Sequence, residues 1–218
     1  MTQSQHTLNA ALHESAKAMP VIPVVSLADA TQADPLGAAL RAGGVNVCEV
    51  TLRTPQALDA IRAMARAHPM MMIAAGTVLT PDDGAKAIEA GARFLVSPGI
   101  TPALAHAAQT WPVPLLPGAA TASEAMALAD MGYRFQKFFP AEAAGGVTTL
   151  AALAAPLANI AFCPTGGVKE TTAATYLALD NVVCVGGSWL APPAMLADGA
   201  FEQIAALAAA AQALRPIV

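Results

Sequence analysis

Short apolar runs alternate with longer alanine-rich stretches along nearly the whole chain. The runs have the length and the β-branched composition of buried strands, whereas the stretches repeat their apolar residues at helical spacing. Four stretches begin with a threonine that could cap a helix: Thr54, Thr80, Thr101 and Thr121. Eight strands are therefore expected, at residues 21–25, 45–52, 71–78, 94–97, 115–118, 135–139, 160–164 and 182–186.

Eight strand–helix units in 218 residues predict one α/β domain, a (β/α)8 TIM barrel. We assign residues 21–218 to the barrel and residues 1–20 to a short N-terminal extension, which we expect to be helical and to cover the bottom of the barrel. A doubly wound open sheet is the alternative. It is less well supported because Ser26, Leu27 and Ala28 follow the first run, instead of a Gly-x-Gly-x-x-Gly turn.

Composition and charge narrow the class of protein. Hydrophobic residues make up 56% of the chain and charged residues 12%, which predicts apolar surface that packs against a partner subunit in a homo-oligomer. The net charge of −4, without a basic tract, argues against nucleic acid or an anionic membrane as a partner. The sequence has no signal-peptide pattern and no apolar run of membrane-spanning length, so we expect a cytoplasmic protein.

The cysteines and histidines do not suggest a metal site. Cys48, Cys163 and Cys184 lie inside apolar runs without Cys-x-x-Cys spacing, so buried free thiols are expected. No histidine falls at a predicted strand end, and no pair has the spacing of metal ligands. We therefore expect neither a metal nor an organic cofactor.

One lysine stands out because it lies in an apolar, aromatic run. Lys137 is flanked by Phe135, Phe138 and Phe139, and the chain has only three other lysines. Burial disfavours a charged ammonium, and a neutral amine is a nucleophile toward carbonyl carbon. The residues alone leave two interpretations: a lysine that forms a Schiff base, or one that reaches water or pairs with a carboxylate.

The second apolar run ends in alternating polar residues. The strand period of two places Glu49 and Thr51 on one face, together with Arg53 if the strand continues. A carboxylate in an apolar setting suits a general acid or base, and an arginine can hold a substrate carboxylate through two hydrogen bonds. An internal ion pair between Glu49 and Arg53 that neutralises both charges is the alternative.

Other runs also end in small or polar residues, and in a barrel these ends meet at the active-site face. Thr77 closes the third run, and Pro98 follows the fourth. Glycine pairs follow the last two runs, at residues 166–167 and 186–187, where exposed N–H groups could hold a phosphate. Taken singly, each of these positions is also compatible with an ordinary turn.

Six segments in a fixed order resemble a known family. They are GVNVCEVTLR at 44–53, GTVL at 76–79, SPG at 97–99, KFFPAE at 137–142, CPTGG at 163–167 and GGSW at 186–189. From about residue 20 to its end, the chain resembles the 2-keto-3-deoxy-6-phosphogluconate (KDPG) aldolases, which include enzymes that act on 4-hydroxy-2-oxoglutarate (KHG). The resemblance implies a class I aldolase that cleaves KDPG to pyruvate and D-glyceraldehyde 3-phosphate through a lysine Schiff base, in the Entner–Doudoroff pathway.

The resemblance also implies a role for each matching residue. Lys137 would form the Schiff base and Glu49 would act as general acid and base, while Arg53 and Thr77 would hold the keto-acid end. The remaining pocket and phosphate positions fall on Pro98, Phe139, Thr165, Gly166, Gly167, Gly187 and Ser188. A homotrimer that acts on a phosphorylated 2-keto acid, without a metal or cofactor, is implied as well.

One position departs from the family pattern. Gln136 stands before the lysine, where the family usually has an apolar residue. By alternation its side chain points away from the barrel interior, so the departure bears on packing more than on chemistry.

Three alternatives to a KDPG aldolase stay open. The first is an aldolase for unphosphorylated KHG or for the galactonate-derived epimer of the substrate. The second is a phosphosugar isomerase on the same barrel, and the third is a non-catalytic phosphate-binding barrel. The last two would have no need of Lys137 beside Glu49.

Overall fold

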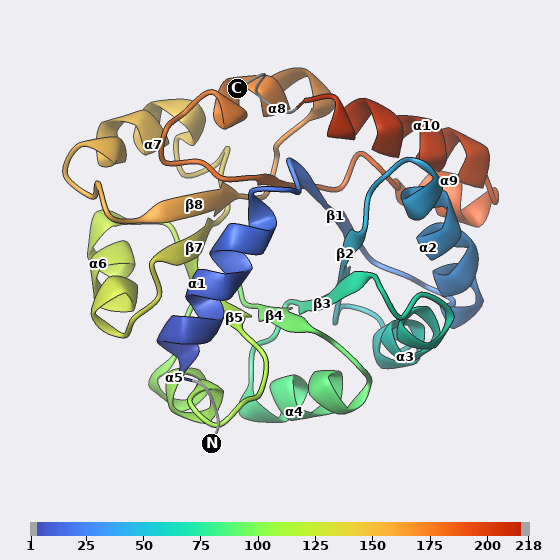
Figure 1. The fold of residues 1–218 in the computed structure, drawn as a ribbon, viewed down its shortest axis with the longest axis horizontal. Helices are drawn as coiled ribbons and strands as arrows, with labels where there is room; N and C mark the ends of the chain where they lie inside the picture. The colour runs from blue at the N-terminus through green and yellow to red at the C-terminus, as the bar shows by residue number, and fades with distance from the viewer. Residues whose placement is uncertain (1–3, 215–218) are drawn as a thin grey trace.

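The computed structural model describes residues 4–214 and shows an α/β fold. Strands surround the centre and helices lie outside them (Figure 1). The strands are β1 (Val21–Val25), β2 (Val47–Thr51), β3 (Met72–Gly76), β4 (Phe94–Val96), β5 (Leu115–Leu116), β6 (Gly118–Ala119), β7 (Phe135–Phe138), β8 (Ala161–Pro164) and β9 (Val185–Gly187). The helices are α1 (Gln5–Ala16), η1 (Ala30–Gln32, a 3-10 helix), α2 (Ala33–Ala42), α3 (Ala57–Ala67), α4 (Pro81–Glu89), α5 (Pro102–Ala108), α6 (Ala122–Asp130), α7 (Gly146–Ala154), α8 (Glu170–Leu177), α9 (Pro193–Ala197) and α10 (Phe201–Gln212). Every expected strand is present, with ends shifted by a few residues.

The strands pair in parallel but form two sheets rather than the single eight-stranded sheet expected. The larger, curled sheet has the order β5-β4-β3-β2-β1-β9, and the smaller has the order β6-β7-β8. The predicted strand at residues 115–118 is divided because Pro117 separates β5 from β6. Proline has no N–H to donate. Its carbonyl accepts from the backbone N–H of Lys137 at 2.9 Å, so the chain leaves β4 here and joins β7.

The two sheets also meet along β8. Isolated parallel bridges pair Phe162 with Val182 and Thr165 with Gly186, which places β8 beside β9 and the segment before it. The backbone N–H of Val183 donates to the Phe162 carbonyl at 3.0 Å. The smaller sheet is thus continuous with β5 through Pro117 on one side and hydrogen-bonded to the β9 segment on the other.

Three of the four expected threonine caps are confirmed. Thr80, Thr101 and Thr121 cap α4, α5 and α6, and each hydroxyl accepts a hydrogen bond from a backbone N–H in the first turn of its helix. The expectation for Thr54 is wrong, because the residues after it form a turn and α3 begins only at Ala57. The Thr54 hydroxyl instead donates to the Leu27 carbonyl at 2.6 Å.

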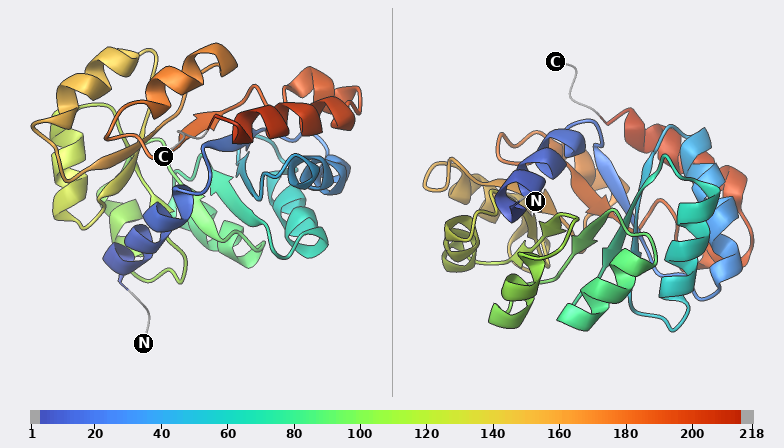
Figure 2. Two further views of the ribbon diagram at one scale, coloured as in Figure 1. Left: turned by 45° about the horizontal axis from the view of Figure 1, so that its top comes forward. Right: turned by 60° about the horizontal axis from the view of Figure 1, so that its bottom comes forward.

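Helix α1 packs against the ends at which the strands begin (Figure 2). Asn9 Oδ1 accepts from the backbone N–H groups of Arg134 at 3.1 Å and Phe135 at 2.9 Å, and Asn9 Nδ2 donates to the Phe135 carbonyl at 2.8 Å. Gln5 Oε1 accepts from the backbone N–H of Leu115 at 3.0 Å. Both side chains are buried, so α1 supplies partners for strand-end groups that would otherwise lack them.

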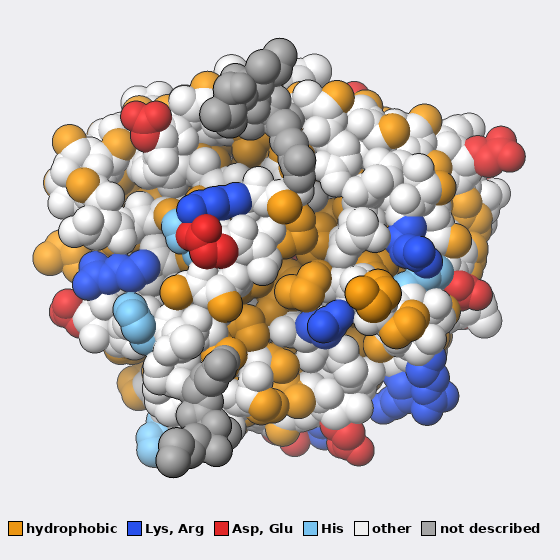
Figure 3. All heavy atoms as spheres, viewed as in Figure 1, with side chains coloured by type: hydrophobic (Ala, Val, Ile, Leu, Met, Phe, Trp, Pro, Cys, Tyr) orange, Lys and Arg blue, Asp and Glu red, His pale blue; other side chains and the backbone are white. Residues whose placement is uncertain are grey.

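The core lies between the strands and the surrounding helices and is mostly aliphatic, alanine and phenylalanine side chains. The expectation of buried free thiols is confirmed for Cys48, Cys163 and Cys184. Apolar groups also reach the surface, where the large side chains exposed within residues 4–214 are Met70, Leu79, Met126 and Met131. Figure 3 shows apolar side chains gathered over the face that carries α1, with few charged groups among them. None of the described helices is long and apolar enough to cross a membrane.

Candidate active site

Lys137 and Glu49 form a buried ion pair. Nζ of Lys137 on β7 donates to Oε1 of Glu49 on β2 at 3.3 Å, and the two side chains are only 5% and 4% exposed. Lys137 is thus paired with a carboxylate, an arrangement that both interpretations of the lysine allow. Its partner is the other residue for which acid–base chemistry was predicted, so the pair brings a nucleophile and a proton carrier into contact.

The backbone around β2 explains why Glu49 can occupy this position. Glu49 lies opposite Val24 of β1 and Ala74 of β3 in the parallel register. Two residues farther along β3, Gly76 leaves the space that the carboxylate fills, because a Cβ there would lie 2.1 Å from Glu49 Oε1. Thr51, which alternation places on the Glu49 face, is buried and hydrogen-bonds to Ser26 Oγ at 2.6 Å.

Phe139 connects the lysine to one of the glycine turns. Lys137 Nζ lies 5.1 Å from the centroid of the Phe139 ring, within the range of a cation–π contact. The same ring packs on Gly166, where a Cβ would lie 3.1 Å from the nearest ring carbon. The predicted residues Lys137, Phe139 and Gly166 are thus neighbours.

Arg53 and Thr77 form a second contact between predicted site residues. Arg53 Nε donates to Thr77 Oγ1 at 3.0 Å, and Arg53 is exposed because β2 ends before it. The alternative ion pair with Glu49 is not formed, since the ion-pair partner of Glu49 is Lys137. Thr77 has φ of 60°, a left-handed conformation that no other described non-glycine residue adopts. A β-branched residue is strained there, and such strain is found preferentially at functional sites.

The remaining predicted residues lie at or beyond the carboxyl ends of β4, β8 and β9. Thr165 is buried against Gly186, whose added Cβ would lie 2.3 Å from the threonine hydroxyl oxygen. The Trp189 ring covers Gly187, and Ser188 is exposed. Pro98 lies with its carbonyl oxygen 2.2 Å from the position of a Cβ added to Gly118. Glu49 and Lys137 lie within β2 and β7, and the other predicted residues lie at or after the carboxyl ends of parallel strands, where barrel enzymes bind substrates.

The glycine turn after β8 rests on residues that the sequence analysis did not single out. Gly166 and Gly167 have φ of 98° and 85°. The Glu142 backbone N–H donates to the Gly166 carbonyl at 3.0 Å, and its carboxylate accepts from the Tyr176 hydroxyl at 2.7 Å. Glu142 was visible only as the last residue of the KFFPAE segment, and Tyr176 had no signal beyond its place in a helical stretch.

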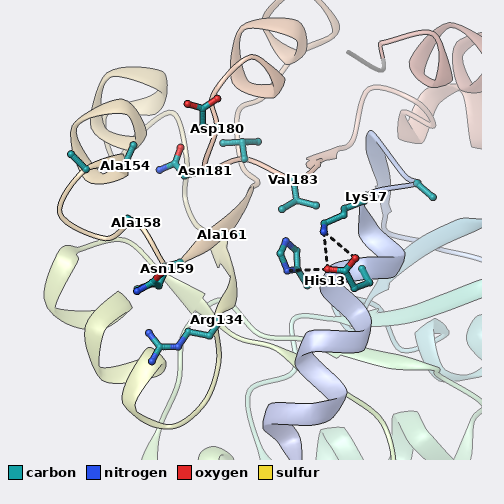
Figure 4. A pocket seen from close by; sticks show the side chains of 15 residues that line it. His13, Lys17, Arg134, Ala154, Ala158, Asn159, Ala161, Asp180, Asn181 and Val183 are labelled. Carbon is teal, nitrogen blue, oxygen red and sulfur yellow. Dashed lines mark hydrogen bonds and ion pairs between the residues drawn. The ribbon is translucent and has the colours of Figure 1, made fainter. Parts of the chain in front are cut away.

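The large hollow in Figure 4 lies elsewhere. It is bordered by α1 and by the segments that precede β7, β8 and β9, with His13, Lys17, Arg134 and Asn181 among its polar side chains. Burial, and then the charge of Lys17, lower the pKa of His13. Neither Lys137 nor Glu49 lines this hollow, so it is separate from the catalytic candidates.

Gln136, the departure from the family pattern, points away from Glu49. Gln136 is buried with its Nε2 donating to the carbonyls of Ala125 in α6 and Tyr133, so it faces the helix layer as alternation predicted. Within residues 4–214, no group of three or more His, Cys, Asp or Glu side chains is arranged to hold a metal ion.

Comparison with known proteins identifies the family. The sequence model described as "KDPG and KHG aldolase" matches residues 12–207. The chain belongs to this family. The KHG/KDPG aldolase of Escherichia coli (strain K12) is 49% identical over 189 residues, covering 87% of this chain and 89% of the relative. The 2-dehydro-3-deoxy-phosphogluconate aldolase of Zymomonas mobilis is 46% identical over 173 residues, covering 79% and 83%.

Solved structures of the family match the fold as well. The KDPG aldolase of Legionella pneumophila, with pyruvate captured as a covalent carbinolamine intermediate, has a TM-score of 0.88 and 42% identity, covering 95% of this chain and 98% of that one. The Zymomonas mobilis KDPG aldolase with 3-phosphoglycerate has a TM-score of 0.86 and 42% identity, covering 94% and 97%.

Proposed function

We propose that this protein is a class I aldolase that cleaves KDPG to pyruvate and D-glyceraldehyde 3-phosphate. The observation that carries the proposal is the buried contact of 3.3 Å between Lys137 Nζ and Glu49 Oε1, in a chain of the KDPG and KHG aldolase family. The carbinolamine captured in the Legionella pneumophila relative is the adduct that a lysine forms with the carbonyl of pyruvate.

In the first half of the reaction, Lys137 acts as the nucleophile. Lys137 first passes a proton to Glu49, and the neutral amine adds to the C2 carbonyl of the keto acid to form a carbinolamine. Glu49 then gives that proton to the hydroxyl group, which leaves as water. The product is a protonated imine. Because Glu49 Oε1 is already within 3.3 Å of Nζ, the proton has a short path in the closed interior.

In the second half, the imine withdraws electrons from the C3–C4 bond. Glu49, directly or through a water, removes the proton of the C4 hydroxyl as the bond breaks, and glyceraldehyde 3-phosphate leaves. The remaining enamine is protonated at C3, and hydrolysis of the imine releases pyruvate and the free Lys137 amine. The Phe139 ring, 5.1 Å from Nζ, stabilises the cationic forms of the nitrogen.

The two charged ends of the substrate go to different groups. Arg53 binds the carboxylate with its terminal nitrogens while Thr77 Oγ1 holds its Nε at 3.0 Å. The phosphate binds to backbone N–H groups of the turns at residues 166–167 and 187–188, because glycine allows close approach. Pro98 and Thr165 complete the lining of the pocket.

KHG is a second candidate substrate, because the Escherichia coli relative is named for both activities. The same Lys137 and Glu49 chemistry applies to it, since the bond that breaks is again C3–C4 of a 4-hydroxy-2-keto acid. The galactonate-derived epimer differs at C4 alone and remains an alternative. An isomerase or a non-catalytic phosphate-binding barrel leaves the buried Lys137–Glu49 pair without a use.

We further infer that the two sheets form one closed (β/α)8 barrel over residues 21–218, with residues 1–20 as an N-terminal extension. The bridge of Thr165 with Gly186 and the continuity through Pro117 support closure. Residues 1–3 and 215–218, at the ends of these ranges, lie outside the described part.

A homotrimer and a cytoplasmic location stay predictions. Sedimentation of the purified protein tests the trimer.

The deciding experiment is an aldol-cleavage assay of KDPG, its galactonate-derived epimer and KHG, each coupled to pyruvate detection. The proposal predicts the highest kcat/KM for KDPG. A higher value for the epimer or for KHG would reassign the substrate within the family. Interconversion of a phosphosugar without release of pyruvate would favour the isomerase.

A further inference from the structure

The glycine turn after β8 has little to hold it in its own sequence. Gly166 and Gly167 both have positive φ and carry no side chain, so the turn gains neither packing nor rotamer preference from its own residues. Its conformation therefore depends on neighbouring elements. A phosphate that binds to backbone N–H groups needs those groups already aimed at it, because ordering a loose loop on binding costs affinity.

The neighbour that holds this turn is Glu142. Its backbone N–H donates to the Gly166 carbonyl at 3.0 Å, and the preceding Ala141 N–H donates to the Thr165 carbonyl at 2.8 Å. The aliphatic part of the Glu142 side chain also lies against the turn, because a Cβ on Gly167 would be only 2.6 Å from its Cγ. Glu142 thus restrains the turn through both its backbone and its side chain.

Glu142 is itself held by Tyr176. The tyrosine hydroxyl donates to Glu142 Oε1 at 2.7 Å, from a ring that is fully buried on α8. Burial, the hydrogen bond to Glu142 and the charge of Glu142 all raise the pKa of Tyr176, so its hydroxyl stays a donor at neutral pH. Glycine at position 146 gives this hydroxyl its space, since a Cβ there would lie 3.0 Å from the oxygen.

The hydrogen bond from Tyr176 also affects how close the negative charge of Glu142 comes to the phosphate. Glu142 is exposed as a residue, and its carboxylate is negative beside a turn to which we assign a dianionic phosphate. Like charges repel most when the carboxylate is free to approach the ligand. The bond from Tyr176 fixes that carboxylate on the side of α8 and Gly146.

We propose that Glu142 and Tyr176 are positioning residues that fix the Gly166 and Gly167 turn for the phosphate of the substrate, and so set the preference for phosphorylated over unphosphorylated keto acids. This inference rests on the proposed aldolase function. Neither residue touches the reacting carbons, so their effect should appear in binding of the phosphorylated substrate and not in imine formation.

The test compares KDPG with KHG as substrates of the Tyr176→Phe variant. Loss of one hydrogen bond to a charged group should lower the ratio of kcat/KM for KDPG to that for KHG by about tenfold or more, through KM for KDPG. Tyr133→Phe is the matched control, because the Tyr133 hydroxyl is buried but has no hydrogen-bond partner among the described residues. It should leave the ratio unchanged.

Substitutions of Glu142 keep the inference testable if Tyr176→Phe folds poorly, because Glu142 is exposed. Glu142→Gln retains an acceptor oxygen for Tyr176 and should keep the preference for KDPG. Glu142→Ala loses both the acceptor and the contact with Gly167, so it should lower the ratio as Tyr176→Phe does.

Unchanged ratios in both Tyr176→Phe and Glu142→Ala would overturn the inference and leave the aldolase function intact. The inference would also be overturned if kcat/KM for KDPG, kcat/KM for KHG and the trapping of pyruvate on the enzyme all fell by the same factor. That result would show a general structural role. A wild-type enzyme that traps pyruvate but does not cleave KDPG would overturn the proposed substrate, and this inference with it.

Discussion

Glu49 Oε1 lies 3.3 Å from Lys137 Nζ, although β2 and β7 belong to different sheets. The two side chains meet across the interior of the fold, with almost no access to solvent. A carboxylate that only neutralised a buried lysine would also adopt this arrangement. Variants that separate proton transfer from ion pairing therefore distinguish a catalytic role for Glu49 from a structural one.

Glu49→Gln should slow cleavage of KDPG by about 10²–10⁴-fold, because the amide cannot carry the proton. Affinity for pyruvate and the melting temperature should change little, since the amide oxygen can still accept from Lys137. Steady-state kinetics with thermal unfolding provides the measurement. Glu89→Gln, at an exposed position on α4, is the control and should behave as wild type. A loss of stability with normal turnover of the folded fraction would identify Glu49 as a structural partner.

Arg53→Ala should weaken the binding of every 2-keto acid, phosphorylated or not, by about 1.5–3 kcal/mol. The reason is the loss of a charge-assisted hydrogen bond to the carboxylate that all these substrates share. The quantity to measure is kcat/KM for KDPG and for KHG. Arg66→Ala, which removes an exposed arginine on α3, is the matched control. A strong effect on KDPG alone would place Arg53 at the phosphate instead.

Gly167→Val should penalise KDPG far more than KHG. The added side chain meets Glu142, whose Cγ would be 2.6 Å from the new Cβ, and it obstructs the approach of a phosphate. Part of any loss comes from the strain of φ at 85°, so Gly44→Val, at φ of 82° in the loop before β2, controls for that strain. Equal losses for both substrates in Gly167→Val would contradict the phosphate assignment.

Asn9→Ala should lower the free energy of unfolding by about 2–4 kcal/mol, because the backbone N–H groups of Arg134 and Phe135 lose their acceptor. Urea unfolding measures the change. Asn159→Ala is the control, since Asn159 is exposed. Equal stability of the two variants would show that α1 contributes little to holding the strand ends.

Exhaustive dialysis against a chelator should leave cleavage of KDPG unchanged, because the Lys137 imine itself accepts the electrons of the C3–C4 bond. Activity before and after dialysis is compared under identical substrate concentrations. Loss of activity that zinc or magnesium restores would favour a metal-dependent aldolase.

Local pattern predicted the strands and located the candidate site residues near the strand ends. Apolar runs located every strand, and Glu49 and Thr51 both lie within β2, where the period of two places them on one face. The strand ends were harder to predict, because Arg53 lies in the turn after β2 and bonds to Thr77 instead of following the alternation. The prediction that Thr54 caps a helix was wrong for a similar reason, because a turn follows Thr54 and α3 begins only at Ala57.

Contacts between distant segments could not be predicted from pattern. The pairing of Glu49 with Lys137 depends on the order of strands and on the space at Gly76. The division of one strand at Pro117 depends on which neighbour each half bonds to. The contact of Glu142 with Tyr176 likewise joins residues 34 positions apart, on a turn and a helix.

Reductive trapping shows whether Lys137 forms a Schiff base with the keto acid. Wild-type protein is incubated with pyruvate and borohydride, and the reduced adduct is located by peptide mass. We expect one adduct per chain, on Lys137, and no adduct in Lys137→Ala. Labelling that persists in that variant, or that falls on Lys17, Lys86 or Lys169, would show that Lys137 is not the Schiff-base lysine.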